Sequence, residues 1–182
     1  TLFRSILHAQ GYRIGLFVSP YVDRFNERIQ LNDEPISDED LAALVSEVAP
    51  IVDSMQIPVT EFEIIAAIAF LYYARQNCDY VVLEVGLGGE LDATNVIDTP
   101  LLAIITAIDY DHMHILGNTI GEIAQAKAGI IKDNGTVLFY GEHQDALPVI
   151  QDACERHHAK LNICDRSTIV PESYDLHGQS FS

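Results

Sequence analysis

The stretch Tyr80-Val81-Val82-Leu83-Glu84-Val85-Gly86-Leu87-Gly88-Gly89 guides the interpretation of this 182-residue chain. Its first four residues are apolar or aromatic, a composition typical of a buried strand. A carboxylate, Glu84, follows where that strand should end, and glycines come soon after it. Because ligands of open α/β sheets bind at the carboxyl ends of the strands, Glu84 is a candidate ligand for a hard cation such as Mg²⁺. For this motif alone, a solvated acid in a glycine turn is the better explanation.

Around this strand the chain alternates between expected strands and expected helices. Strands are expected at residues 14–18, 80–84, 101–106, 136–140 and 161–164, and helices at 1–10, 37–54, 60–75, 119–129 and 146–158. Capping boxes at residues 60–63 and 119–122 mark two of the helix starts. The alternation predicts an α/β fold with a mainly parallel sheet flanked by helices. Residues 171–182 are expected to form a hairpin remnant or a frayed end.

Composition excludes several classes of partner. The net charge of −17 argues against binding to nucleic acid or to an anionic membrane surface. No uninterrupted apolar run approaches the ~20 residues of a membrane span. The three cysteines form no CxxC pair, and their odd number argues against a disulfide framework, which favours a reducing cytoplasm. An anionic ligand would have to be met by a few well-placed cations, helix N-termini or metal ions.

Polar groups follow four of the expected strands, at Ser19, at Glu84, at Thr106 with residues 109–112, and at residues 141–143. In one parallel sheet these carboxyl ends lie along a common edge. A serine hydroxyl, a glutamate carboxylate and a histidine nitrogen could complete a Mg²⁺ shell with waters and phosphate oxygens, although histidine is the less usual ligand. As an isolated residue, His112 is more often a hydrogen-bonded loop histidine, and spacing does not rank it above His114.

The basic residues also have two interpretations each. Lys127 stands near the end of an expected helix, where it either complements the helix dipole in solvent or lies close to phosphates or a metal. Arg24 and Arg28 either pair with neighbouring acids or offer guanidinium groups to a carboxylate-bearing substrate. A serine hydrolase is set aside because Ser19 lacks the Gly-x-Ser-x-Gly context.

Six stretches match one known family in order and approximate spacing, from Gly15 to about Gly141. They are Gly15-Leu16-Phe17-Val18-Ser19-Pro20, Arg24-Phe25-Asn26-Glu27-Arg28-Ile29, Thr60-Glu61-Phe62-Glu63, residues 83–95, Asp111-His112 with Leu116-Gly117, and Lys127-Ala128-Gly129-Ile130-Ile131. Together they resemble the folylpolyglutamate synthase family, which includes bifunctional dihydrofolate synthases and belongs to the Mur-ligase group of ATP-dependent amide-forming ligases.

The resemblance implies a Mur-ligase-type P-loop ATPase domain and a reaction in two steps. ATP phosphorylates a carboxylate of dihydropteroate or of a folate, and the amino group of L-glutamate then attacks the acyl phosphate. The implied cofactor is Mg²⁺, the partners are small-molecule substrates, and the intact enzyme is expected to be a cytoplasmic monomer. Positioning and charge neutralisation dominate catalysis of this kind.

Site residues are implied by the same resemblance. Glu84 matches a magnesium ligand, and His112 and Ser19 match contributors to a second ion. Lys127 matches a lysine that is typically carbamylated and lies by the metal and the nucleotide. Glu84, His112 and Lys127 are therefore the expected catalytic residues.

The expected substrate-binding residues are Ser19, Pro20, Arg28 and Asp92. Two positions depart from the family pattern. Glu90 stands where many members have arginine, and Gln125 stands where glutamate is common. Neither change removes an expected metal ligand, although the first could alter contacts with the substrate.

Residues 1–182 are expected to be a partial ATP-binding domain. In the family, the Gly-Lys-Ser/Thr phosphate loop lies just before the position of Thr1, and the end of the ATPase domain and the glutamate-binding domain follow Ser182. An internal fragment of this kind is expected to be inactive alone. The alternatives are another Mur-type ligase that uses a different acid, and a non-catalytic, degenerate homologue that acts as a binding module.

Overall fold

The computed structural model describes residues 2–141, 143–176 and 178–182, and it has the α/β class expected from the sequence. The chain divides into two compact units. Unit 1 comprises Thr1–Leu87 and Asp92–Val96, and unit 2 comprises Gly88–Leu91 and Ile97–Ser182. In the described residues no helix has the length and apolar character needed to cross a membrane.

Unit 1 contains a four-stranded sheet with the order β3-β2-β1-β4. Its elements are α1 (Leu2–Ala9), β1 (Ile14–Phe17), η1 (Phe25–Arg28), β2 (Ile29–Leu31), β3 (Glu34–Pro35), α2 (Asp38–Ser54), α3 (Glu61–Arg75) and β4 (Tyr80–Leu83). Strands β1 and β4 are parallel, with Phe17 opposite Leu83, so both strands end at the same level. Strand β2 is antiparallel to β1 and to β3.

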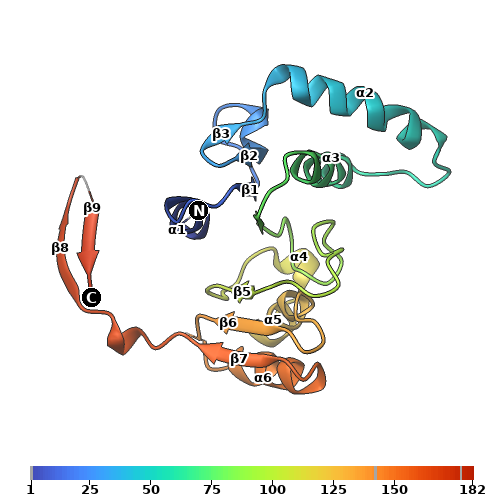
Figure 1. Cartoon of the computed structure of the whole chain (residues 1–182). Coiled ribbons are helices and arrows are strands. Elements are labelled where there is room, and N and C mark those ends of the chain that lie inside the picture. Colours follow the sequence, from blue (N-terminus) through green and yellow to red (C-terminus); the bar gives the residue numbers. More distant parts are fainter. Residues whose placement is uncertain (1, 142, 177) are drawn as a thin grey trace. The chain divides into compact units, whose positions relative to one another are not determined.

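The core of unit 1 lies between this sheet and helix α3. Every residue of β1 is buried, and α3 packs against both β1 and α2, as its apolar composition on nearly all sides predicts. Figure 1 shows α2 and α3 as neighbouring helices. The Tyr73 hydroxyl donates a hydrogen bond to the Leu16 carbonyl at 2.6 Å. A Cβ on Gly15 would lie 2.6 Å from the Tyr73 ring, so this close packing requires glycine.

Unit 2 contains a three-stranded parallel sheet with the order β5-β6-β7 and a separate antiparallel pair, β8-β9. Its elements are β5 (Ala103–Ile105), α4 (Met113–Leu116), α5 (Ile120–Ala128), β6 (Thr136–Phe139), α6 (Leu147–Arg156), β7 (Lys160–Ile163), η2 (Arg166–Thr168), β8 (Pro171–Asp175) and β9 (Gly178–Phe181). The core is built from side chains of β5, β6, α5 and α6, among which Ile123, Val137 and Ile150 are fully buried.

The expected helices and strands are confirmed to within about two residues at most ends. Both capping boxes are present, with the Thr60 and Thr119 hydroxyls accepting from the main-chain N–H groups of Glu63 and Glu122. The last residues form the hairpin β8-β9 instead of a frayed end. Of the residues singled out in the sequence, Thr1 and Glu142 lie outside the described residues, as does His177.

The strands expected from the sequence pair in parallel, as predicted, and the structure adds antiparallel strands that the sequence did not predict. The described residues form three separate sheets, and β2 and β3 add antiparallel strands beside β1. The turn between β2 and β3 contains Asn32 at φ 56°, a left-handed conformation that asparagine adopts more easily than most residues. This tight turn brings the chain back alongside β2, where β3 pairs with it in antiparallel register.

Candidate functional site

Ser19 and Glu84 lie together at the carboxyl ends of β1 and β4, as the sequence predicts. The main-chain N–H of Ser19 donates to Oε2 of Glu84 at 2.9 Å, and the N–H of Glu84 donates to the Phe17 carbonyl at 3.0 Å. These contacts follow from the parallel register, which ends the two strands at the same level. Glu84 is exposed and Ser19 is half-buried, so the pair faces solvent at the end of the sheet.

The donor set of this pair suits a hard cation. Within the described residues, Oε1 of Glu84 accepts no hydrogen bond and the Ser19 hydroxyl has no partner, so both oxygens are available. A carboxylate and a hydroxyl are ligands that Mg²⁺ accepts, together with water and phosphate oxygens. The described residues contain no cluster of three His, Cys, Asp or Glu side chains that could hold a metal. A cation at Glu84 would therefore need oxygens from water or from a bound substrate.

Asp92 holds the loop that follows Glu84. Its Oδ2 accepts from the Leu87 N–H at 2.9 Å, and its Oδ1 accepts from the N–H and the hydroxyl of Thr94 at 2.9 and 2.5 Å. Thr94 is buried. The carboxylate thus joins two points of the loop, a structural role that its position in the sequence did not reveal. The expected contact between Asp92 and a substrate stays a prediction.

The glycines of this loop are required by its packing in unit 2. The N–H of Glu90 donates to the Ala126 carbonyl at 3.1 Å, and a Cβ on Gly89 would lie 2.9 Å from that same oxygen. A Cβ on Gly129 would lie 2.3 Å from the Cβ of Glu90. These glycines let the main chain approach the end of α5 closely. The last turn of α5 carries Lys127.

Lys127 lies on α5 and His112 directly precedes α4, and α4 packs against α5 in unit 2. Lys127 is half-buried, and within the described residues its amine forms no hydrogen bond or ion pair. His112 precedes α4 at φ 48°, is exposed, and has Nε2 3.7 Å from Oδ1 of Asp111. A metal shell that combines His112 with Ser19 and Glu84 would span both units, and it stays a prediction.

The two arginines of the 24–29 motif have different environments. Arg24 pairs with Asp38, with Nη2 3.0 Å from Oδ1, as expected for an arginine with an acidic neighbour. The guanidinium carbon of Arg28 lies 5.3 Å from the centre of the Tyr21 ring and 5.6 Å from that of Phe25. Within the described residues, Arg28 forms no ion pair, and its buried Nε has no hydrogen-bond partner. Its charge is therefore held by aromatic faces and is available to an anion.

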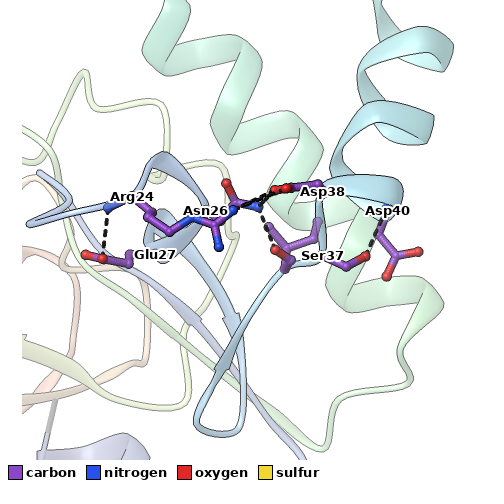
Figure 2. A network of polar contacts seen from close by, with 7 residues as sticks. Arg24, Asn26, Glu27, Ser37, Asp38 and Asp40 are labelled. Atoms are coloured by element: carbon purple, nitrogen blue, oxygen red, sulfur yellow. Dashed lines mark hydrogen bonds and ion pairs between the residues drawn. The ribbon is translucent and has the colours of Figure 1, made fainter.

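Sequence reasoning missed a polar network that fixes this motif. Asn26 is buried and donates to the Ile36 carbonyl and to Oδ1 of Asp38, both at 2.8 Å. Figure 2 shows Arg24 and Asn26 converging on Asp38 at the start of α2, and Glu27 contacting Arg24. Asn26 and Glu27 lie within a motif that was recognised, but neither residue type signals this role by itself.

Comparisons with known proteins match most of this chain. Residues 41–167 match the model of the Mur ligase middle domain. The dihydrofolate synthase/folylpolyglutamate synthase of Bacillus subtilis is 46% identical over 185 residues, which cover 98% of this chain and 43% of that protein.

Solved structures give the same result. A structure described as an FPGS-AMPPCP-folate complex has 37% identity and a TM-score of 0.89, covering 98% of this chain and 45% of its own. The E. coli FolC structure in complex with DHPP and ADP has 29% identity and a TM-score of 0.83, covering 97% of this chain and 43% of its own. The chain thus spans less than half the length of these proteins.

Proposed function

The chain belongs to the Mur ligase middle domain family, and on that premise we propose that the protein containing it is an ATP-dependent amide ligase. It adds L-glutamate to dihydropteroate, to folates or to both. The names of the relatives and their complexes with AMPPCP, folate, DHPP and ADP support this choice. The observation that carries it in this chain is the Ser19–Glu84 pair, with unpartnered oxygens at the carboxyl ends of two parallel strands.

The proposed reaction transfers the γ-phosphoryl group of ATP to a carboxylate of the acid substrate and releases ADP. The amino group of L-glutamate then attacks the acyl phosphate, forms the amide bond and displaces inorganic phosphate. Mg²⁺, when bound, supplies positive charge to the phosphate oxygens. Ser19 and Glu84 are proposed to hold it through their free oxygens, and His112 to contribute a nitrogen. Lys127, in the carbamylated form that the resemblance implies, is proposed to act near the nucleotide.

Arg28 is the proposed contact for the acid substrate. It is a cation that lies against two aromatic rings, and an arginine can bind a carboxylate with two parallel hydrogen bonds. Pro20 and Asp92 are proposed to line the same substrate-binding region, together with Ser19. Asp92 would do so while it keeps its three hydrogen bonds within the loop.

The test uses the protein of natural length that contains this chain. Purified protein is incubated with Mg-ATP, L-glutamate and either dihydropteroate or a reduced folate, and ADP and the glutamylated product are both measured. We expect ADP and product in equal amounts, and no ADP above background when the acid is omitted. If neither acid yields ADP and a glutamylated product, the proposed function is excluded. A wider panel of acids would then identify another Mur-type reaction.

A matched pair of variants tests the metal role. Glu84→Gln keeps an oxygen that can accept from the Ser19 N–H but removes the charge, so we expect turnover to fall by about 10²-fold or more. Glu39→Gln removes an exposed carboxylate on α2 and should leave turnover unchanged. Normal turnover of the Glu84 variant at limiting Mg²⁺ would refute its role as a ligand.

We also propose a cytoplasmic location and a monomeric state for the full-length protein. The three cysteines are free, which is compatible with a reducing compartment. Light scattering of the purified protein tests the oligomeric state, and cell fractionation tests the location.

A further inference from the structure

Glu27 makes an unusual set of hydrogen bonds with the main chain that precedes it. Its Oε2 accepts from the Val22 N–H at 2.8 Å, and its Oε1 accepts from the N–H groups of Arg24 and Asp23 at 3.0 and 3.2 Å. One carboxylate therefore gathers the N–H groups of three successive residues, and both of its oxygens are needed. Hydrogen bonds from main-chain N–H groups favour the charged form and hold the pKa of Glu27 below its ordinary value.

A second set of contacts fixes η1 from the other side. Asn26 bonds the Ile36 carbonyl and Asp38, and Arg24 bonds both oxygens of Asp38 at the start of α2 (Figure 2). Because Asn26 is buried, its own bond to the Ile36 carbonyl is protected from water. The η1 turn is therefore anchored to α2, and the carboxylate of Glu27 is a fixed point on which residues 22–24 are held.

Holding residues 22–24 also determines where Tyr21 lies. Tyr21 directly precedes the three residues bound by Glu27, and its ring packs on Phe25 with the ring centres 5.8 Å apart. The Arg28 guanidinium lies against both rings. Tyr21 is 41% exposed, so much of its surface faces solvent. If residues 22–24 were released, Arg28 would lose one of its two aromatic neighbours.

The other arginines of unit 1 are held in a different way, because the side chain of each one contacts a polar side chain. The pairs are Arg4 with Asp33, Arg13 with Gln76, Arg24 with Asp38 and Arg75 with Glu47. Arg28 has no such partner within the described residues, so its direction depends on the rings beside it. The segment that supplies one of those rings is held by Glu27.

We propose that Glu27 is a positioning residue for binding of the acid substrate. Its carboxylate holds residues 22–24 folded over η1, which keeps Tyr21 against Arg28 and orients the guanidinium toward the anionic group of the acid. This inference rests on the proposed function, and it adds a residue that does not itself touch the substrate.

The test measures steady-state kinetics of the natural-length protein and its Glu27→Gln, Tyr21→Ala and double variants. Glutamine has one acceptor oxygen in place of two, so Glu27→Gln must lose some of the hydrogen bonds from the N–H groups of residues 22–24. We expect KM for the acid to rise about tenfold, with KM for ATP and kcat nearly unchanged, as when a charge-assisted hydrogen bond that orders a binding group is lost. Tyr21→Ala should have a similar effect.

The double variant separates positioning from independent damage. If Glu27 acts through Tyr21, the rise in KM of the double variant stays near that of either single variant instead of reaching their roughly hundredfold product. Glu63→Gln is the matched control, because Glu63 also accepts main-chain and hydroxyl hydrogen bonds, but at the start of α3 and through Oε2 alone. It should leave every kinetic constant unchanged.

The outcomes are distinguishable. A wild-type protein that is inactive with both acids overturns the proposed function and this inference with it. The inference alone is overturned if the wild type is active and KM for the acid is unchanged in Glu27→Gln. It is also overturned if the rise in KM of the double variant equals the product of the two single rises. Should Glu27→Gln fail to fold, an unchanged KM for the acid in Tyr21→Ala overturns it as well, and a tenfold rise supports it.

Discussion

Replacing Gly129 by alanine tests whether α5 packs on the glycine loop as closely as the structure shows. A Cβ at this position would lie 2.3, 2.4 and 2.7 Å from the Cβ, Cα and N atoms of Glu90. Ordinary contacts of a Cβ are 3.4–4 Å long. These neighbours are main-chain atoms and the first side-chain atom, which cannot rotate away. The loop must therefore move by about an ångström, and the bond from the Glu90 N–H to the Ala126 carbonyl must lengthen.

The expected cost follows from three terms. Forcing extra volume into a packed contact costs about 1–3 kcal/mol, and a weakened hydrogen bond costs about 1 kcal/mol. Alanine returns about 0.5–1 kcal/mol by restricting the unfolded chain. The balance is a loss of about 2 kcal/mol in the free energy of unfolding. With a urea dependence of about 1.5 kcal/mol per molar, the unfolding midpoint of unit 2 should fall by about 1 M.

Gly121→Ala is the matched control within the same helix. Its Cβ would have no neighbour closer than 4.0 Å, so the higher helix propensity of alanine should raise the midpoint by about 0.5 M. Urea unfolding followed by far-UV circular dichroism measures the midpoints, and hydrogen exchange of the α5 amides follows unit 2 alone. If Gly129→Ala unfolds at the wild-type urea concentration or above it, the close packing of α5 on Glu90 is refuted.

Three further predictions concern single contacts. Tyr73→Phe removes a buried hydrogen bond to a β1 carbonyl and should lower the free energy of unfolding by about 1–2 kcal/mol; an unchanged melting temperature would contradict this. Asp92→Ala should accelerate hydrogen exchange of the loop amides that it holds while circular dichroism stays the same, and unaltered exchange would exclude its loop-holding role. Hydrogen bonds from the Asn118 N–H and the Thr119 hydroxyl lower the pKa of Glu122 in the folded protein. The charged carboxylate therefore stabilises the fold at pH values above its ordinary pKa, and this stabilisation is lost as the pH falls through the lowered pKa. Glu122→Gln should therefore flatten the acid side of the stability curve of unit 2, and a curve parallel to that of the wild type would disprove this.

Elements with local signals could be predicted from the sequence. The hydroxyls at Thr60 and Thr119 with a glutamate three residues later gave the starts of α3 and α5, because a capping box depends only on neighbours in the chain. The pairing of Ser19 with Glu84 followed from one further assumption, that β1 and β4 are parallel. Parallel strands that end at the same level bring the next residues together, so this contact could be predicted without knowledge of the whole fold.

Contacts that depend on a folded loop could not be predicted. Strands β2 and β3 are very short and have no clear alternation of apolar and polar residues, so nothing in the sequence marked them. Glu27 stands three residues after Arg24, which is not a usual helix-capping residue, and the pattern therefore does not resemble a capping box. The role of Gly129 depends on Glu90, a residue 39 positions earlier in the chain.

Charge gives the most direct argument for the proposed substrate-binding role of Arg28. The chain has 27 acidic and ten basic Lys and Arg residues, so an arginine has many chances to meet a carboxylate. An arginine that instead lies against two aromatic rings, with a buried Nε that has no partner, keeps a charge that the fold has not neutralised. Retaining such a charge is costly unless a ligand completes its hydrogen bonds. An anionic acid would complete them, whereas a neutral ligand would leave the guanidinium unsatisfied.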